Sequence, residues 1–321
     1  MDWIQISIQT TTAGIEPVSG RLYQLGITGL EIEDAADFND FLENSKEYWD
    51  YVDESLMAKS TAPTCIKLYL TCNASGFETL GEIRQTLAQL ASSDPTKEFG
   101  TLHLSMANMS EQDWAENWKQ YYKPIKVGEK ILIKPEWETV ADTEGRIVFE
   151  SNPGMSFGTG THQSTQLCIE LMENHITSGM SVLDLGCGSG ILSIIAILLG
   201  ADNAVALDID PNAAKIAAEN AALNKVLPPA YASIAGNIIT DTALQQQFAS
   251  VRYDIVFANI VADVIIALAP FVKSFLKENG SLITSGIIAD RLNEVKSTLE
   301  QNGFTIQQVC VKDDWAAIVA L

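Results

Sequence analysis

The C-terminal half of the chain alternates short apolar runs with longer amphipathic stretches. The apolar runs have the length of buried strands, and the amphipathic stretches repeat their apolar positions at helical spacing. Strands that alternate with helices predict a mostly parallel sheet, with helices on both faces and right-handed crossovers. The pattern therefore predicts a Rossmann-like α/β domain over residues 149–321.

Seven strands are expected in this domain, together with a helix that begins near Thr165. The expected strands are 181–185, 204–207, 231–234, 253–258, 281–284, 304–311 and 315–321, and the further helices are 191–199, 211–224, 263–278 and 289–301. Pro211 suits the first position of its helix, where a missing N–H costs nothing. Only Lys312, Asp313 and Asp314 separate the last two strands. So short a turn permits a hairpin but no parallel crossover, so the last strand should be antiparallel.

The first 105 residues carry a different pattern. Strands are expected at 3–8, 29–33, 65–70 and 102–105, and helices at 16–25 and 77–90. This β-α-β-β-α-β order predicts a smaller α+β domain of the ferredoxin-like type over residues 1–105. Residues 34–60 are acidic and aromatic, and we expect a loop or insertion there.

A connector is expected over residues 106–148. It contains a strand-like segment at 130–134 and many aromatic side chains, namely Trp114, Trp118, Tyr121, Tyr122 and Trp137. A flexible linker would not carry so many aromatics. We therefore expect the connector to pack against the C-terminal domain, with its tryptophans in ordinary core and interface contacts.

The length of 321 residues is typical of two domains, and the net charge is −21. Binding to a phosphate backbone requires basic patches, so the acidity disfavours direct contact with nucleic acid. A strongly acidic protein attracts basic partners, although the same charge also maintains solubility without any partner.

Five cysteines are scattered along the chain without a CxxC pair. We therefore expect no zinc site, no disulfide framework and no metal in the functional site. The first residues lack the basic flank and apolar core of a signal peptide. The longest apolar run, 191–199, is too short to span a bilayer. These features predict a cytoplasmic protein without a membrane segment.

A glycine-rich motif lies between the first expected strand of the α/β domain and its first helix. It places Asp184 just before Gly186, Gly188 and Gly190. Glycines there let the backbone turn tightly and approach a nucleotide, and the helix that follows presents free N–H groups. A dinucleotide-binding GxGxxG motif would have its third glycine at Ile191. The Asp-x-Gly-x-Gly-x-Gly pattern instead resembles the signature of class I methyltransferases, which use S-adenosylmethionine.

Two further polar residues follow expected strands. Asp208 ends the second strand, 22 residues after Gly186, where a carboxylate can accept hydrogen bonds from ribose hydroxyls. Asp210 is expected to cap the helix that starts at Pro211. Asn259 ends the fourth strand, and ligands of open α/β sheets bind at such carboxyl ends. We therefore expect Asn259 near the reacting centre, where its amide could accept hydrogen bonds from a target amine.

At this point the chain resembles the family of ribosomal protein L11 methyltransferases, or PrmA family. The most specific likeness is the segment 152–165, NPGMSFGTGTHQST, which is similar to the Phe-Gly-Thr-Gly-Thr-His segment of that family. The resemblance extends over nearly the whole chain, through residues 3–29, Trp114, Trp118, Pro124, 135–137, 184–192 and 258–260.

The resemblance implies that S-adenosylmethionine is contacted by Thr165, Gly186, Asp208 and Asn259. It also implies that the first domain holds the substrate, a basic protein of the large ribosomal subunit, and that lysine side-chain and N-terminal amines are methylated. The chain departs from the family at Asn152, which is often Asp, and at Gln163 and Ser164, which are more usually Pro and Thr. None of these departures falls on the four contact positions.

The expected reaction is in-line attack of an amine on the sulfonium methyl group, with the protein supplying binding and alignment. The amine must first lose a proton, and desolvation favours its neutral form. Asn259 would orient the lone pair. No dedicated base is evident: Asp263 is only a guess, and His162 is expected to order its loop rather than act as a base.

Two alternatives remain open at this stage. The chain could methylate lysines of another basic protein, or it could be a non-catalytic module that binds a nucleotide to regulate a partner. The Asn-Pro-Pro-Tyr motif of amide and adenine methyltransferases is absent, because Ile260 and Val261 follow Asn259. A dehydrogenase is disfavoured by the glycine spacing.

Overall fold

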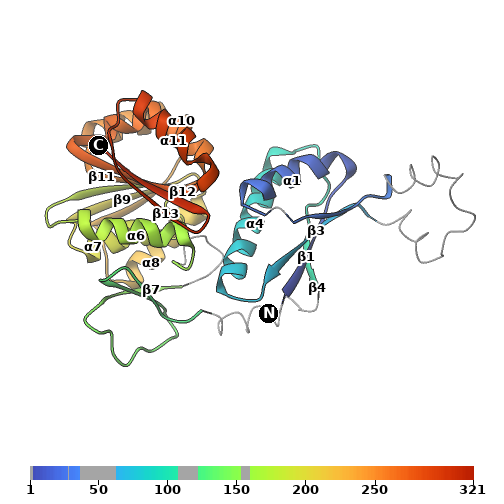
Figure 1. Ribbon diagram of the computed structural model, residues 1–321, viewed down its shortest axis with the longest axis horizontal. Helices are drawn as coiled ribbons and strands as arrows, with labels where there is room; N and C mark the ends of the chain where they lie inside the picture. Colours follow the sequence, from blue (N-terminus) through green and yellow to red (C-terminus); the bar gives the residue numbers. More distant parts are fainter. Residues whose placement is uncertain (1–2, 28, 37–62, 108–121, 153–159) are drawn as a thin grey trace, which may run out of the picture. The chain divides into compact units, whose positions relative to one another are not determined.

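The computed structural model describes residues 3–27, 29–36, 63–107, 122–152 and 160–321 (Figure 1). The chain divides into two compact units, Met1–Tyr121 and Tyr122–Leu321, called here the N-terminal and C-terminal units. The division falls inside the segment that the sequence suggests as a connector. Trp114, Trp118 and Tyr121 of that segment lie outside the described residues.

The N-terminal unit contains a four-stranded antiparallel sheet in the order β2-β3-β1-β4. Its described elements are β1 (Trp3–Gln9), a 3-10 turn (Thr12–Gly14), α1 (Ile15–Gln24), β2 (Glu31–Glu33), β3 (Cys65–Thr71), α4 (Ala74–Ser93) and β4 (Leu104–Ala107). This order is ferredoxin-like, as predicted. The last strand begins later than expected, because Leu102 has a φ of 50°, outside the extended region.

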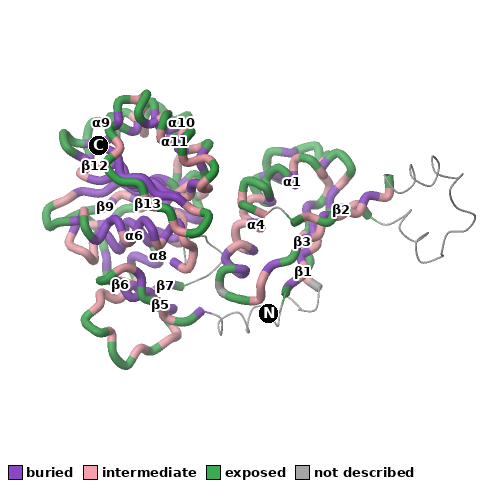
Figure 2. Tube along the Cα trace, in the orientation of Figure 1, coloured by how far each residue is buried: buried purple, intermediate pink, exposed green. Residues whose placement is uncertain are grey.

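Alternation along the central strands builds the core of this unit. Ile6 and Ile8 of β1, Leu68 of β3, and Leu80 and Ile83 of α4 are all fully buried, and α4 packs against β3; Figure 2 colours the buried positions purple. Each such side chain stabilises the fold by about 1.5–3 kcal/mol relative to exposure. The helix itself starts where the Asn73 side chain accepts a hydrogen bond from the Gly76 N–H.

The C-terminal unit is built on a seven-stranded sheet in the order β10-β9-β8-β11-β12-β14-β13. Its strands are β8 (Ser181–Leu185), β9 (Asn203–Asp208), β10 (Tyr231–Ala235), β11 (Tyr253–Asn259), β12 (Leu276–Ile288), β13 (Ile306–Lys312) and β14 (Trp315–Ala320). Strand β14 lies antiparallel between β12 and β13, and the other described pairs are parallel. The prediction of a Rossmann-like sheet with an antiparallel last strand is therefore confirmed.

Helices cover both faces of this sheet (Figure 1). They are α6 (Gln163–His175), α7 (Ile191–Leu198), α8 (Pro211–Leu223), α9 (Thr242–Val251), α10 (Ala262–Val272) and α11 (Leu292–Gln301). One core contains residues of α6, α7 and α8, and the other contains residues of α9, α10 and α11. The adjacent β8 residues Val182 and Leu183 belong to different cores, as expected for a strand that is buried on both faces.

Two details differ from the sequence prediction. The helix expected over 263–278 ends at Val272, and after a 3-10 turn the chain is already extended at Leu276, which pairs with Tyr253. Pro270 removes one N–H donor near the end of this helix. Helix α9 was not anticipated at all.

A small sheet, β5-β6-β7, completes the C-terminal unit. Its strands are β5 (Ile125–Val127), β6 (Ile131–Pro135) and β7 (Ile147–Ser151). Ile131, Ile133 and Phe149 belong to the same core as α6. The Glu173 carboxylate of α6 accepts hydrogen bonds from the Glu129 and Lys130 N–H groups at 2.8 and 2.7 Å. Residues 122–148 of the expected connector are thus an integral part of this unit, and the boundary expected at residue 149 lies inside β7.

In the part of the chain that the structure describes, no helix is long and apolar enough to cross a membrane. The same residues contain no group of three or more metal-ligating side chains.

Candidate functional site

Three neighbouring strands of the C-terminal unit bring the expected site residues to one edge of the sheet. Strands β9, β8 and β11 are adjacent, and their carboxyl ends carry Asp208, Gly186 and Asn259. Ligands of open α/β sheets bind outside this edge. The residues 186–190, called here the glycine loop, connect β8 with α7.

The glycine loop has a backbone that side chains would not tolerate. The φ angles are 72° at Gly186, 53° at Gly188 and 76° at Gly190. A Cβ at Gly186 would lie 2.4 Å from Cγ2 of Ile260, and one at Gly190 would lie 2.6 Å from the Tyr231 hydroxyl oxygen. Glycine alone permits both the conformation and the close packing. The loop is thereby held tightly between β11 and β10, and it begins α7 with Gly190 at the N-cap.

Asp208 is bound to the glycine loop from the neighbouring strand. Its Oδ2 accepts a hydrogen bond from the Gly188 N–H at 2.9 Å, and its Oδ1 accepts one from the Asp210 N–H at 3.0 Å. Burial raises the pKa of the Asp208 carboxyl, and the N–H donors oppose that shift. Asp210 caps α8 by accepting from the Asn212 N–H at 2.8 Å, as predicted. Each Asp208 oxygen retains acceptor capacity for a hydroxyl of a ligand.

Asp184 lies inside the protein rather than on the surface of the site. The residue is only 1% exposed, and its Oδ2 accepts a hydrogen bond from the Ser193 N–H at 3.2 Å. Burial raises the pKa of Asp184 to about 7, against the effect of the Ser193 hydrogen bonds. Its carboxyl connects β8 with the first turn of α7, so it orders the glycine loop that lies between them.

The opposite side of the edge contains a pair of side chains that the sequence places 94 residues apart. Asn259 Nδ2 donates a hydrogen bond to Thr165 Oγ1 at 3.2 Å, and Thr165 is fully buried. Asn259 Oδ1 is also buried, but it finds no hydrogen-bond partner among the described residues. Leaving a buried carbonyl oxygen unsatisfied costs about 1–3 kcal/mol. Such an acceptor at the edge of the sheet fits a ligand that brings an N–H or O–H group.

A further residue at this edge was missed by the sequence analysis. Asn237 follows β10, the strand next to β9, and the neighbouring Gly236 N–H donates to the Asp208 carbonyl at 2.8 Å. Asn237 Oδ1 accepts from the Ile239 N–H at 3.0 Å. A Gly-Asn pair directly after an apolar run could have identified this position from the sequence.

The described end of the Phe-Gly-Thr-Gly-Thr-His segment leads into α6. Residues 157–159 of the segment lie outside the described residues, and Gly160, Thr161 and His162 are described. His162 is the N-cap of α6, with its Nδ1 3.3 Å from the Ser164 N–H nitrogen. Burial lowers the pKa of His162 to about 4. The ring is therefore neutral near pH 7 and serves the local structure, as the sequence suggested.

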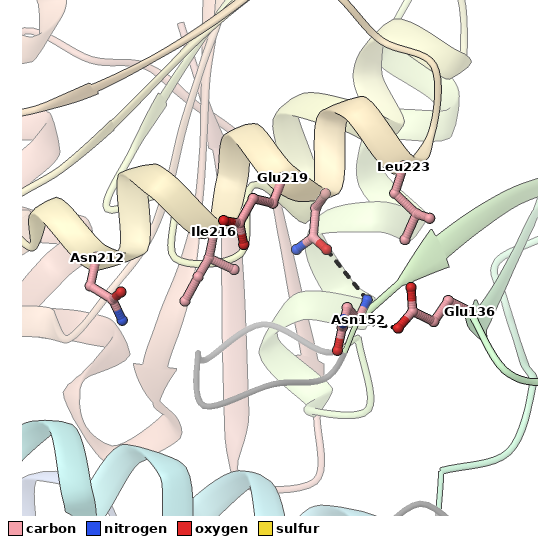
Figure 3. A pocket seen from close by; sticks show the side chains of 7 residues that line it. Glu136, Asn152, Asn212, Ile216, Glu219 and Leu223 are labelled. Carbon is pink, nitrogen blue, oxygen red and sulfur yellow. Dashed lines mark hydrogen bonds between the residues drawn. The ribbon is translucent and has the colours of Figure 1, made fainter.

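A pocket of about 530 Å³ lies along one face of α8 (Figure 3). It is lined by Glu136, Asn152, Asn212, Ile216, Glu219, Asn220 and Leu223. Asn220 connects it to the glycine loop, because its Nδ2 donates to the Ser189 carbonyl at 2.9 Å. Asn152 Nδ2 donates to Glu136 Oε1 at 2.9 Å. An aspartate at position 152 would instead repel Glu136, which gives a local reason for the asparagine.

Comparison with known proteins agrees with this geometry. A family model described as ribosomal protein L11 methyltransferase (PrmA) matches residues 2–321. The ribosomal protein L11 methyltransferase of Alkaliphilus oremlandii is 41% identical over 320 residues, covering 100% of this chain and 98% of the relative. That of Bacillus subtilis is 38% identical over 328 residues, covering 100% and 99%. A crystal structure of ribosomal protein L11 methylase from Lactobacillus delbrueckii subsp. bulgaricus aligns with a TM-score of 0.56 at 31% identity, covering 62% of this chain and 98% of that chain.

Proposed function

The chain belongs to the ribosomal protein L11 methyltransferase family, and from that premise we propose that it transfers methyl groups from S-adenosylmethionine to amines of ribosomal protein L11. The target amines are lysine side chains and the N-terminal α-amino group. The observation that carries the proposal is the buried Asn259 Oδ1, which has no hydrogen-bond partner among the described residues and ends the strand next to a glycine loop that suits a nucleotide.

S-adenosylmethionine supplies an electrophilic methyl group on a sulfonium centre, so the protein needs to bind and align rather than to activate an electrophile. The residues that would hold it are Thr165, Asp184, Gly186, Gly188, Gly190, Asp208 and Asn259. Asp208 would accept hydrogen bonds from the ribose hydroxyls of the cofactor. The glycine loop lets the cofactor approach the backbone without side chains in the way. Asp184 acts indirectly, by ordering that loop through Ser193.

Asn259 is the proposed catalytic residue. Its Oδ1 accepts a hydrogen bond from the target amine, which directs the nitrogen lone pair toward the methyl group. A lysine amine has a pKa of about 10.4 in water, and desolvation at this edge favours its neutral form. The ammonium form of the amine gives its proton to solvent water before the neutral amine attacks. His162 is an unsuitable acceptor for it, because burial holds the pKa of its imidazole at about 4. Asp263 is unsuitable as well, because its Oδ1 forms an ion pair with Arg291 Nη1 at 2.6 Å on the surface.

The acidity of the chain supports a basic protein as substrate. The net charge is −21, and the pocket along α8 adds Glu136 and Glu219 close to the glycine loop. Opposite charge accelerates encounter and orients the partner. We place substrate binding on the N-terminal unit. The reaction takes place in the cytoplasm, where ribosomal proteins are made, and it requires no direct binding of nucleic acid.

The test is methyl transfer from labelled S-adenosylmethionine to a mixture of purified ribosomal proteins. We expect label on L11 alone, at amines, and far less label with the Asp208→Ala variant at a cofactor concentration that does not saturate it. Label on a different basic protein would overturn the substrate while keeping the chemistry. Cofactor binding without transfer to any basic protein would instead support a regulatory binding module.

A further inference from the structure

The turn of the C-terminal hairpin reaches the segment that leads into Thr165. Strand β13 ends at Lys312 and β14 begins at Trp315, and these two residues are paired across the hairpin. Lys312 Nζ donates a hydrogen bond to Gln166 Oε1 of α6 at 3.1 Å. The Trp315 ring packs edge-on against His162, with 4.5 Å between the ring centroids. Two neighbouring side chains of one turn thus hold two residues near the start of α6.

Gln166 also binds the loop that precedes the helix. Its Nε2 donates to the Thr161 carbonyl at 3.0 Å and lies 3.5 Å from the Gly160 carbonyl oxygen. A lysine ammonium can only donate, so Lys312 requires the oxygen side of the amide. The nitrogen side must then face the loop carbonyls. Lys312 therefore fixes the orientation in which Gln166 can hold residues 160–161.

Those loop residues pack against the start of the glycine-loop helix. A Cβ at Gly160 would lie 2.4 Å from Cδ1 of Ile133 and 3.0 Å from Cδ1 of Ile191. Ile191 directly follows Gly190 and is the first residue of α7. The loop leads on to Thr165, which contacts Asn259. A shift of residues 160–161 would consequently disturb both sides of the site.

We propose that Gln166 is a positioning residue for the cofactor site and that the hairpin turn, through Lys312, sets the affinity for the cofactor. Gln166 acts through the Gly160–His162 backbone and not by touching the reacting atoms. The inference rests on the proposed function only in placing the cofactor between the glycine loop and the Thr165–Asn259 pair.

The decisive variant is Gln166→Glu, studied by calorimetric titration with S-adenosylhomocysteine. The glutamate keeps an oxygen for Lys312 but cannot donate to the Thr161 carbonyl. We expect affinity to fall about tenfold, because one hydrogen bond is lost and a carbonyl is left without its donor. In turnover assays the KM for S-adenosylmethionine should rise while kcat at saturation stays within about twofold. Binding equal to that of the unmodified chain would overturn the inference.

Glu170 provides a matched control. Its Oε1 lies 3.3 Å from Lys312 Nζ, but it makes no hydrogen bond to the described loop residues 160–162. The Glu170→Gln variant should therefore bind S-adenosylhomocysteine normally. Lys312→Met leaves Gln166 in place and should weaken binding about threefold, with rescue by Lys312→Arg. Equal affinities of the Met and Arg variants would overturn the role of the turn, even if Gln166→Glu failed to fold.

The same titration separates this inference from the proposed function. If Asp208→Ala loses binding while Gln166→Glu and Lys312→Met retain it, the cofactor site stands and the positioning role is wrong. If the unmodified chain does not bind S-adenosylhomocysteine, both are wrong.

Discussion

The two sides of the candidate site are constructed in opposite ways. On the β8–β9 side, polar groups are satisfied within the protein: Gly188 donates to Asp208, and Gly186 donates to the Leu207 carbonyl at 2.8 Å. On the β11 side, Asn259 contacts Thr165 through its nitrogen and leaves its buried oxygen without a partner among the described residues. The first side is complete without a ligand, and the second is not.

This difference separates binding from reaction. A loop whose hydrogen bonds are already made is preorganised, so it binds a cofactor with little rearrangement. An acceptor that aligns the attacking amine acts on the transfer step itself, so its contribution belongs to the rate. Changes on the β8–β9 side should therefore alter affinity, and changes at Asn259 should alter turnover.

Asp208→Ala is expected to have the largest effect. It removes two acceptors for ribose hydroxyls and also releases the Gly188 N–H, so the Kd for the cofactor should rise about 100-fold or more. Calorimetric titration measures this change. Asp210→Ala is the matched control, because it removes only the cap of α8; it should cost about 1 kcal/mol of stability and leave the Kd nearly unchanged. Equal effects of the two variants would contradict the account.

Asn259→Ala should act on the other side of the comparison. Loss of the amine acceptor is expected to lower the single-turnover rate of methyl transfer about 30-fold, while the Kd for the cofactor changes less than about threefold. Asn259→Asp keeps an acceptor oxygen and should retain more activity than the alanine variant. An alanine variant with normal turnover and weak cofactor binding would reverse the assignment.

Gly190→Ala tests whether the glycine loop depends on tight packing. An alanine at this position would have to adopt a φ of 76°, and its Cβ would lie 2.9 Å from the Ala217 Cβ. We expect the free energy of unfolding to fall by about 2–3 kcal/mol and the Tm to fall by roughly 5–10 °C. Gly179→Ala offers the control, since its φ is 91° but nothing lies within 4 Å of its Cβ. That variant should lose only about 1 kcal/mol, and similar losses for the two would contradict a packing role.

A further effect is expected in the pH dependence of stability, which Asp184 sets. Burial raises its pKa from 3.8 to about 7 in the folded chain. The folded state then retains this proton to a higher pH than the unfolded state does. Stability contributed by the group is therefore present at low pH and lost as pH rises from about 4 to about 7. Asp184→Asn removes the titration and can still accept from Ser193.

Urea unfolding at about pH 5 and about pH 8 measures this dependence. The stability of the asparagine variant relative to the unmodified chain should be higher at the upper pH. A constant difference between the two proteins would show that the Asp184 carboxyl titrates as it does in the unfolded chain.

Local patterns predicted much of this structure. The alternation of apolar residues located the strands, and the short turn at 312–314 predicted the antiparallel last strand. Asp210 was recognised as a helix cap because capping requires only neighbouring residues. Helix α9 was not predicted, because its sequence, TALQQQFASV, buries only Phe248 and is interrupted by three consecutive glutamines.

Contacts between distant residues could not be inferred in the same way. Gln166 and Lys312 are 146 residues apart, and only the insertion of β14 between β12 and β13 brings the hairpin turn to α6. Asn259 was expected at the reacting centre from its strand end, but its bond to Thr165 depends on how α6 packs on the sheet. The early start of β12 at Leu276 likewise follows from pairing with Tyr253.

The most direct test is the single-turnover rate of methyl transfer to L11 as a function of cofactor concentration, with Asp208→Ala and Asn259→Ala measured side by side. The account predicts that Asp208→Ala approaches the rate of the unmodified chain as the cofactor saturates, whereas Asn259→Ala remains slow at every concentration. Recovery of both variants at saturation, or of Asn259→Ala alone, would contradict the division between a binding side and a reacting side.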